Sequence, residues 1–326
     1  MGENSNIFLS RDQQQYATLL KKKGYVMSEK ITRRAFIKQG IFLTGGVLGG
    51  MGLGPATIGA DAKPDIFVVQ GTNYFANTIK AVDGLGGMNR IVSKGSRVGL
   101  LVNHSFLNIG AHVHPDMTVA IARMCYDAGA KETILIKSPP WGYFRRVRSD
   151  KQAKEAIRML KSPSGDHKTV PIKGALALKR ADIMKDLLEC DVFINTAIVK
   201  SHSATFITAV LKNMMGSAKF STCLQFHRGN DPIHLAQCIA DINLVRKPDL
   251  CVMDATEVLA TGGPRGPGLV KRPRKVFVGR DPVAVDTYAT RLLGVDPQRI
   301  LMLDYASRHG LGQKDLRKVR IREIVA

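Results

Sequence analysis

The sequence predicts an α/β fold, in which one large domain holds a mostly parallel sheet with helices on both faces. Short apolar runs alternate along the chain with longer segments of helical periodicity, and this alternation is typical of parallel sheets. Hydrophobic residues make up 44% of the 326 residues, enough for a substantial core. No repeat or low-complexity tract interrupts residues 63–326, so we expect a single domain there.

Each predicted strand is a short run rich in valine, isoleucine and leucine, and each predicted helix has apolar residues three or four positions apart. Asp281 followed by Pro282 is a typical helix start, because aspartate caps the first turn and proline fits its first position. Glycine and proline predict a loop over 262–268. The predicted strands are 98–102, 133–136, 192–199, 250–253 and 276–278, and the predicted helices are 117–128, 151–160, 181–188, 204–215, 233–245 and 283–293.

Residues 1–62 are interpreted as an N-terminal extension and a twin-arginine signal peptide. Arg33 and Arg34 lie in the sequence TRRAFIK, a Gly-rich apolar run follows, and an A-x-A cleavage signal ends at Ala62. We therefore expect recognition by the twin-arginine export machinery and a periplasmic or other extracytoplasmic location. The apolar run is shorter than the roughly 20 residues that span a bilayer, so no stable transmembrane helix is expected after cleavage. Two alternatives stay open: the signal is cleaved or anchors the protein, and translation starts at Met1 or Met27.

The formal net charge is +21, which favours anionic partners. Lipid head groups, cell-wall polymers and phosphorylated or carboxylated small molecules are the candidates, because export and the absence of a recognisable motif argue against nucleic acid. Among these, an anionic small molecule is the expected ligand. The five cysteines include no C-x-x-C pair. The sequence therefore contains no iron–sulfur cluster motif and no zinc ribbon.

Polar residues gather where the predicted strands end. In open α/β sheets ligands bind at the carboxyl ends of the strands. Asn103 and His104 follow the first strand, and Lys200 and His202 follow the third. Asp254 follows the fourth strand, whereas Trp141, the single tryptophan, and His227 lie in loops.

Four short motifs resemble those of a known family. They are Lys200-Ser201-His202, the sequence LKNMMG at 211–216, GPRG at 263–266, and DPVAVD at 281–286. In this order and spacing they resemble the family called domain of unknown function 362, over roughly residues 95–295. The resemblance implies an α/β fold and leaves the reaction open. Many relatives carry a ferredoxin-like cluster module, and this chain lacks the cysteines for one.

Lys200, His202 and Asp286 are the candidate catalytic residues. Lys200 and His202 lie two positions apart, so a continuing strand would place both on one side. Lysine would hold an anion, and histidine would bind metal or transfer a proton. Asp286 lies within an apolar helix, where capping does not explain it. The alternative to a catalytic role is that Lys200 lies on the surface and His202 is a hydrogen-bonded loop residue.

The candidate ligand-binding residues are two basic residues, an asparagine, a glycine and the single tryptophan. Lys212 follows an apolar stretch and would either extend to solvent or enter the site. Arg265 stands among glycines whose exposed N–H groups suit a carboxylate or phosphate. Asn213 has a structural alternative, since it could cap the end of its helix. The full set is Lys212, Asn213, Arg265, Gly263 and Trp141.

The cofactor is left unknown, with a metal ion as one option. The candidate metal ligands are His202, His227, Asp254 and His104. The leading hypothesis is an exported protein whose polar cleft binds an anionic small molecule, a metal ion or both, with acid–base or metal chemistry. The alternative is a non-catalytic periplasmic protein that binds a ligand or metal for assembly.

Overall fold

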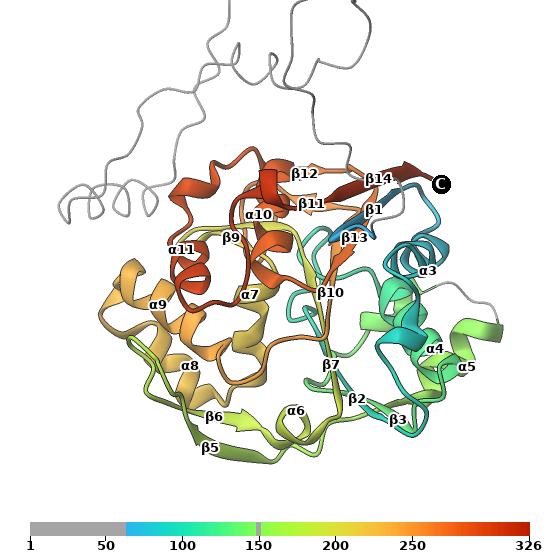
Figure 1. Ribbon diagram of the computed structural model, residues 1–326, viewed down its shortest axis with the longest axis horizontal. Helices are drawn as coiled ribbons and strands as arrows, with labels where there is room; N and C mark the ends of the chain where they lie inside the picture. Colours follow the sequence, from blue (N-terminus) through green and yellow to red (C-terminus); the bar gives the residue numbers. More distant parts are fainter. Residues whose placement is uncertain (1–62, 148–150) are drawn as a thin grey trace, which may run out of the picture. The chain divides into compact units, whose positions relative to one another are not determined.

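The computed structural model describes residues 63–147 and 151–326, and Lys63–Ala326 form one compact unit. The predicted signal peptide lies outside the described residues. An eight-stranded sheet runs through the centre of the unit (Figure 1). Its strands, in spatial order, are β14 (Ile321–Val325), β1 (Ile66–Gln70), β13 (Lys275–Gly279), β10 (Leu250–Ala255), β7 (Val192–Ile198), β2 (Arg97–Val102), β3 (Glu132–Leu135) and β4 (Leu160–Lys161).

Helices cover both faces of this sheet, as the sequence predicts for strands that are apolar throughout. All seven residues of β7 and all six of β10 are buried. Figure 1 shows α3 (Tyr74–Gly84), α4 (Pro115–Asp127) and α5 (Lys151–Met159) on one face. The helices on the other face are α7 (Val210–Asn213), α9 (Pro232–Ile242), α10 (Pro282–Leu293) and α11 (Leu301–Arg308).

The sheet is mostly parallel, and β13 is the exception among the described strands. It pairs antiparallel with β1 on one side and with β10 on the other. A strand at 276–278 that ran parallel to its neighbours would place the following residue Asp281 at the ligand edge. The reversed direction of β13 puts Asp281 at the opposite edge, beside the start of β1.

Two predicted helices are wrong in part. Residues 181–188 contain the strand β6 (Arg180–Met184), which pairs with β5 (His167–Pro171), before the short α6 (Lys185–Glu189). Residues 204–215 contain the strand β9 (Phe206–Thr208), which pairs with β8 (Lys200–His202), before the single turn of α7. Apolar runs this short do not separate strand from helix by periodicity alone.

The remaining elements complete the domain around the sheet. They are α8 (Phe220–Phe226) and the strand pair β11 (Val258–Leu259) and β12 (Val270–Lys271). Among the described residues, no helix has the length and apolar character needed to cross a membrane.

Candidate functional site

The candidate site lies where the order of the strands reverses. From β2 the chain runs outward through β3 and β4, and it then returns to β7 and β10 on the other side of β2. Asn103 directly follows β2, and Lys200 begins β8, two residues after β7. Such a switch point, at the carboxyl ends of two parallel strands, is the usual ligand position in open α/β sheets.

Lys200 is buried at this switch point. Its Nζ donates to the side-chain oxygen of Asn103 at 3.1 Å and to the backbone oxygen of Ala111 at 2.6 Å. Only 2% of the residue is exposed. Burial, reinforced by the charge of Lys212, lowers the pKa of Lys200 from 10.5 to about 7. The side chain is therefore poised between its charged and neutral forms near neutral pH.

A network of three asparagines supports Lys200. Asn103 donates to the side-chain oxygen of Asn213 at 2.9 Å, and Asn213 donates to that of Asn195 at 2.8 Å. Asn213 also donates to the backbone oxygen of Thr196. The predicted capping role of Asn213 is not seen, because its side chain links α7 to β2 and β7 instead. The network therefore orients the oxygen that accepts from Lys200.

Lys212, His202 and His227 are the other basic side chains near Lys200. These four residues are called the cationic group. Burial lowers the pKa of Lys212 to about 8. Burial and then the charges of Lys212 and Lys200 hold the pKa of His202 well below its usual value. The pKa of His227, at the end of α8, is lowered by burial and by Lys212. No carboxylate is among the groups that shift these four pKa values.

His202 has a defined tautomer. Its Nδ1 accepts from the backbone N–H of Ala204 at 3.1 Å and from that of Thr205 at 3.4 Å. Since Nδ1 is an acceptor, Nε2 carries the proton of the neutral ring. His202 therefore offers a neutral N–H donor beside Lys212.

The Gly/Pro loop packs directly on β8. The backbone N–H of Gly263 donates to the hydroxyl of Ser201 at 3.1 Å. A Cβ on Gly263 would lie 1.8 Å from the backbone oxygen of Ser201, so only glycine fits here. The ring of Phe106 lies 5.3 Å from both Lys200 Nζ and the Arg265 guanidinium. The structure thus brings Gly263 and Arg265 close to Lys200.

Asp286 is not part of this cationic group. Its two carboxylate oxygens accept from the backbone N–H groups of Val210 and Leu211 at 2.8 and 2.9 Å. Those N–H groups begin α7, the helix turn that carries Lys212. Burial raises the pKa of Asp286 to about 7. Its contacts are those of a helix cap supplied from α10.

The candidate metal ligands do not come together. Asp254 accepts from the backbone N–H of His114 at 2.6 Å and from the N–H and hydroxyl of Thr256. His104 is buried, and its Nε2 contacts the backbone oxygen of Lys137 at 3.1 Å. Across residues 63–147 and 151–326, no three His, Cys, Asp or Glu side chains are arranged to hold a metal ion. A site built from His202, His227, Asp254 and His104 is therefore not formed.

Trp141 lies on the surface instead of lining the cationic group. The residue is 83% exposed, and the Arg145 guanidinium stacks 3.8 Å from its ring. Arg146 pairs with Glu257 at 2.8 Å. The loop after β3 therefore contributes a basic, aromatic surface.

Asn195 is the supporting residue that the sequence analysis missed. It is fully buried within β7, and its amide donates to the backbone oxygen of Val210 at 3.1 Å. A signal was available, because asparagine interrupts the otherwise apolar run VFIN at 192–195. A buried polar side chain in a central strand requires partners, and these are the residues of α7.

Comparison with known families agrees with the motifs of this site. A family model described as Domain of unknown function (DUF362) matches residues 101–291, more than half of the chain. The chain belongs to the DUF362 family. The matched range includes every residue of the cationic group as well as Asn103, Asn213 and Arg265.

Two individual proteins are similar to this DUF362 member. Thylakoid-associated protein sll1697 of Synechocystis sp. (strain PCC 6803) is 25% identical over 267 residues, which are 76% of this chain and 79% of that protein. The lactate racemase apoprotein of Thermoanaerobacterium thermosaccharolyticum has a TM-score of 0.40 at 12% identity. That likeness covers 67% of this chain and 54% of the racemase, so it spans about half of the racemase's length.

Proposed function

We propose that this protein binds a small carboxylate- or phosphate-bearing molecule at the switch point between β2 and β7. The observation that carries the proposal is a group of basic side chains, Lys200, His202, Lys212 and His227, whose pKa values are shifted by no carboxylate. Of these four, Lys200 and Lys212 carry positive charge near neutral pH, and buried positive charge without a counter-charge is unfavourable. A bound anion would supply that counter-charge.

Each basic group has a distinct role in the proposed complex. Lys212 is half-buried and contacts the anion, while His202 donates its Nε2–H to it. Lys200 is held by Asn103 and Ala111 and adds positive charge behind them. Arg265, beyond Phe106, binds at the outer side. The metal option has less support, because among the described residues no three His, Cys, Asp or Glu side chains are arranged to hold a metal ion.

Acid–base chemistry on the bound molecule is part of the proposal. Lys212, which contacts the bound molecule in this proposal and has a pKa of about 8, exchanges its proton readily near neutral pH, as an efficient general acid or base does. Perturbed lysines of this kind are common at catalytic sites. The alternative, a non-catalytic binding or assembly protein, uses the same site without transfer of a proton.

Calorimetry with the full chain and its Lys212→Met variant tests the binding step. Inorganic phosphate, malonate and acetate serve as probes, and Lys154→Met, in an exposed lysine of α5, is the matched control. We expect Lys212→Met to weaken binding about tenfold or more, as is typical for the loss of a charged hydrogen bond. Equal affinities in the variant and the wild type would refute the proposal. Proton transfer is tested separately. The ligand is incubated with the protein in D₂O, and NMR measures whether its protons are replaced by deuterium.

We also propose export of the folded protein by the twin-arginine machinery. The support is the TRRAFIK sequence at 32–38 with the apolar run after it. Replacing Arg33 and Arg34 by lysine should leave the protein in the cytoplasmic fraction. Unchanged fractionation of that double variant would count against export by this route.

A further inference from the structure

A second concentration of positive charge lies at the opposite edge of the sheet, around a pocket of about 620 Å³. Asp65 immediately precedes β1, Arg280 and Asp281 immediately follow the antiparallel β13, and Arg320 immediately precedes β14. These positions are the amino ends of the parallel strands. The pocket is therefore separate from the switch point, which lies at the carboxyl ends.

Basic side chains dominate the lining of this pocket. Two carboxylates, those of Asp65 and Asp281, face five basic side chains. The basic residues are Lys63, Arg90, Lys247, Arg280 and Arg320. All five are exposed to solvent, so a ligand would reach them without a change in the fold.

Both carboxylates are already engaged by the protein. Asp65 pairs with Arg320 through both oxygens, at 2.9 and 3.1 Å, and hydrogen bonding to that arginine lowers the pKa of Asp65. Asp281 accepts from the backbone N–H groups of Ala284 at 2.8 Å and Gln313 at 2.7 Å. One carboxylate thus neutralises Arg320, and the other caps α10.

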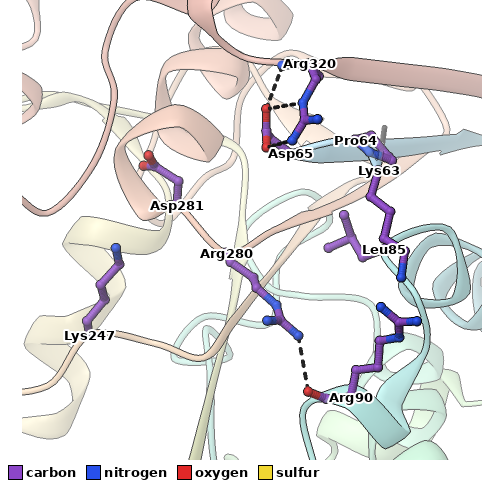
Figure 2. Close-up of a pocket in the computed structure, with 9 residues that line it drawn as sticks. All are labelled: Lys63, Pro64, Asp65, Leu85, Arg90, Lys247, Arg280, Asp281 and Arg320. Atoms are coloured by element: carbon purple, nitrogen blue, oxygen red, sulfur yellow. Dashed lines mark hydrogen bonds and ion pairs between the residues drawn. The ribbon is translucent and has the colours of Figure 1, made fainter. Parts of the chain in front are cut away.

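Four basic side chains are left without an ion pair among the described residues. Arg280 donates to the backbone oxygen of Arg90 at 3.4 Å, and Figure 2 shows this contact across the pocket. The ends of Lys63 and Arg90 lie next to one another in the same view, and a Cβ added to Gly86 would lie 3.3 Å from both Lys63 Nζ and Arg90 Nε. Lys247 lies across the pocket from them, and its end points toward Asp281 in this view. The ends of Lys63 and Arg90 thus lie close together although each could extend into water.

We propose that this pocket binds a small molecule with two or more phosphate groups. Arginine matches phosphate in a bidentate manner, and Lys63, Arg90, Lys247 and Arg280 come from four separate segments. Linked phosphates would offer negative charge to more than one of these segments at once. The volume falls within the usual range of small-molecule sites, about 300–1,000 Å³. The same chemistry is present in a free polyphosphate and in a lipid headgroup that carries two phosphates, such as that of cardiolipin.

Calorimetry with inorganic tripolyphosphate tests this site in the full chain. The variants are Arg280→Met, Arg90→Met and Lys247→Met, with Lys154→Met as the control at an exposed lysine elsewhere. We expect each pocket variant to bind tripolyphosphate about tenfold more weakly or worse, and the control to bind normally. Circular dichroism confirms folding, which these exposed side chains should not affect.

Two further measurements separate the outcomes. Lys212→Met should retain tripolyphosphate binding at the pocket, so failure of the switch-point proposal would not be mistaken for failure of this one. Sedimentation with vesicles that contain cardiolipin identifies a lipid headgroup as the source if these vesicles bind through the same residues and tripolyphosphate does not. The proposal is overturned if neither probe binds, or if the pocket variants and Lys154→Met bind equally.

Discussion

The ammonium group of Lys200 lies 3.1 Å from the side-chain oxygen of Asn103, and this hydrogen bond joins the segments that follow β7 and β2. The two strands are neighbours in the sheet, yet the chain passes through β3 and β4 between them. The contact therefore spans the point where the strand order reverses. The candidate anion site is therefore located where the strand order of the sheet reverses.

Anion binding should weaken as the pH rises. In the free protein Lys200 and Lys212 have pKa values of about 7 and about 8. An anion favours their charged forms, so binding takes up protons. Above these pKa values we expect the affinity for sulfate to fall by up to about tenfold per pH unit for each lysine. Calorimetry from pH 6 to pH 9 measures this, and an affinity that is constant over the range would contradict it.

The stability of the ligand-free protein should rise with pH between about 7 and 10. Lys200 titrates at about 7 when folded and near 10.5 when unfolded, so in this window the unfolded chain binds more protons. One such lysine contributes up to about 1.4 kcal/mol per pH unit to the free energy of unfolding. Urea denaturation should therefore show a smaller pH slope for Lys200→Met than for the wild type. Identical slopes would mean that Lys200 titrates normally in the folded state.

Asp286→Asn should destabilise the protein by about 1–3 kcal/mol. The variant replaces one carboxylate oxygen by an amide, and that amide would face a backbone N–H of Val210 or Leu211. Urea denaturation measures the loss, with Asp83→Asn at an exposed position of α3 as the control. Anion binding should also weaken, because α7 carries Lys212. A variant as stable as the wild type would show that the cap contributes little.

Gly263→Ala should separate the Gly/Pro loop from β8. The added Cβ would lie 1.8 Å from the backbone oxygen of Ser201, so one of the two segments must shift. We expect weaker anion binding through displacement of Arg265, together with a loss of about 1–3 kcal/mol in stability, the usual range for overpacking. Gly216→Ala is the matched control, since its Cβ would meet Leu101 at an ordinary 3.5 Å. Similar affinities for both variants would argue against a role for this loop.

Much of the fold was predictable, because the buried strands are long enough for their apolar character to stand out. The predictions at 98–102, 133–136, 192–199 and 250–253 match β2, β3, β7 and β10 within a few residues. The pairing of β1 with β13 was not predictable from residues 66–70, since the sequence analysis assigned no element there. The hairpin of β8 and β9 was also missed, because each strand has only three residues.

The part of the site that depends on residues close together in the sequence was predictable. Lys200 and His202 are both buried on one side of β8, with Ser201 between them less buried, as their spacing predicted. Asp286 was named as a candidate catalytic residue because capping of its own helix does not explain it. Its partners, Val210 and Leu211, lie on a different helix, and only tertiary contacts reveal them.

The sequence by itself determined the α/β class, the positions of the central strands and the clustering of polar residues after them. These features follow from hydrophobic periodicity and from local turn chemistry, which act over a few residues. Tertiary structure alone decided the direction of β13, the asparagine network around Lys200 and the pocket at the other edge. Strand direction and side-chain partners depend on segments far apart in the chain, which meet only when the apolar faces of the sheet are buried.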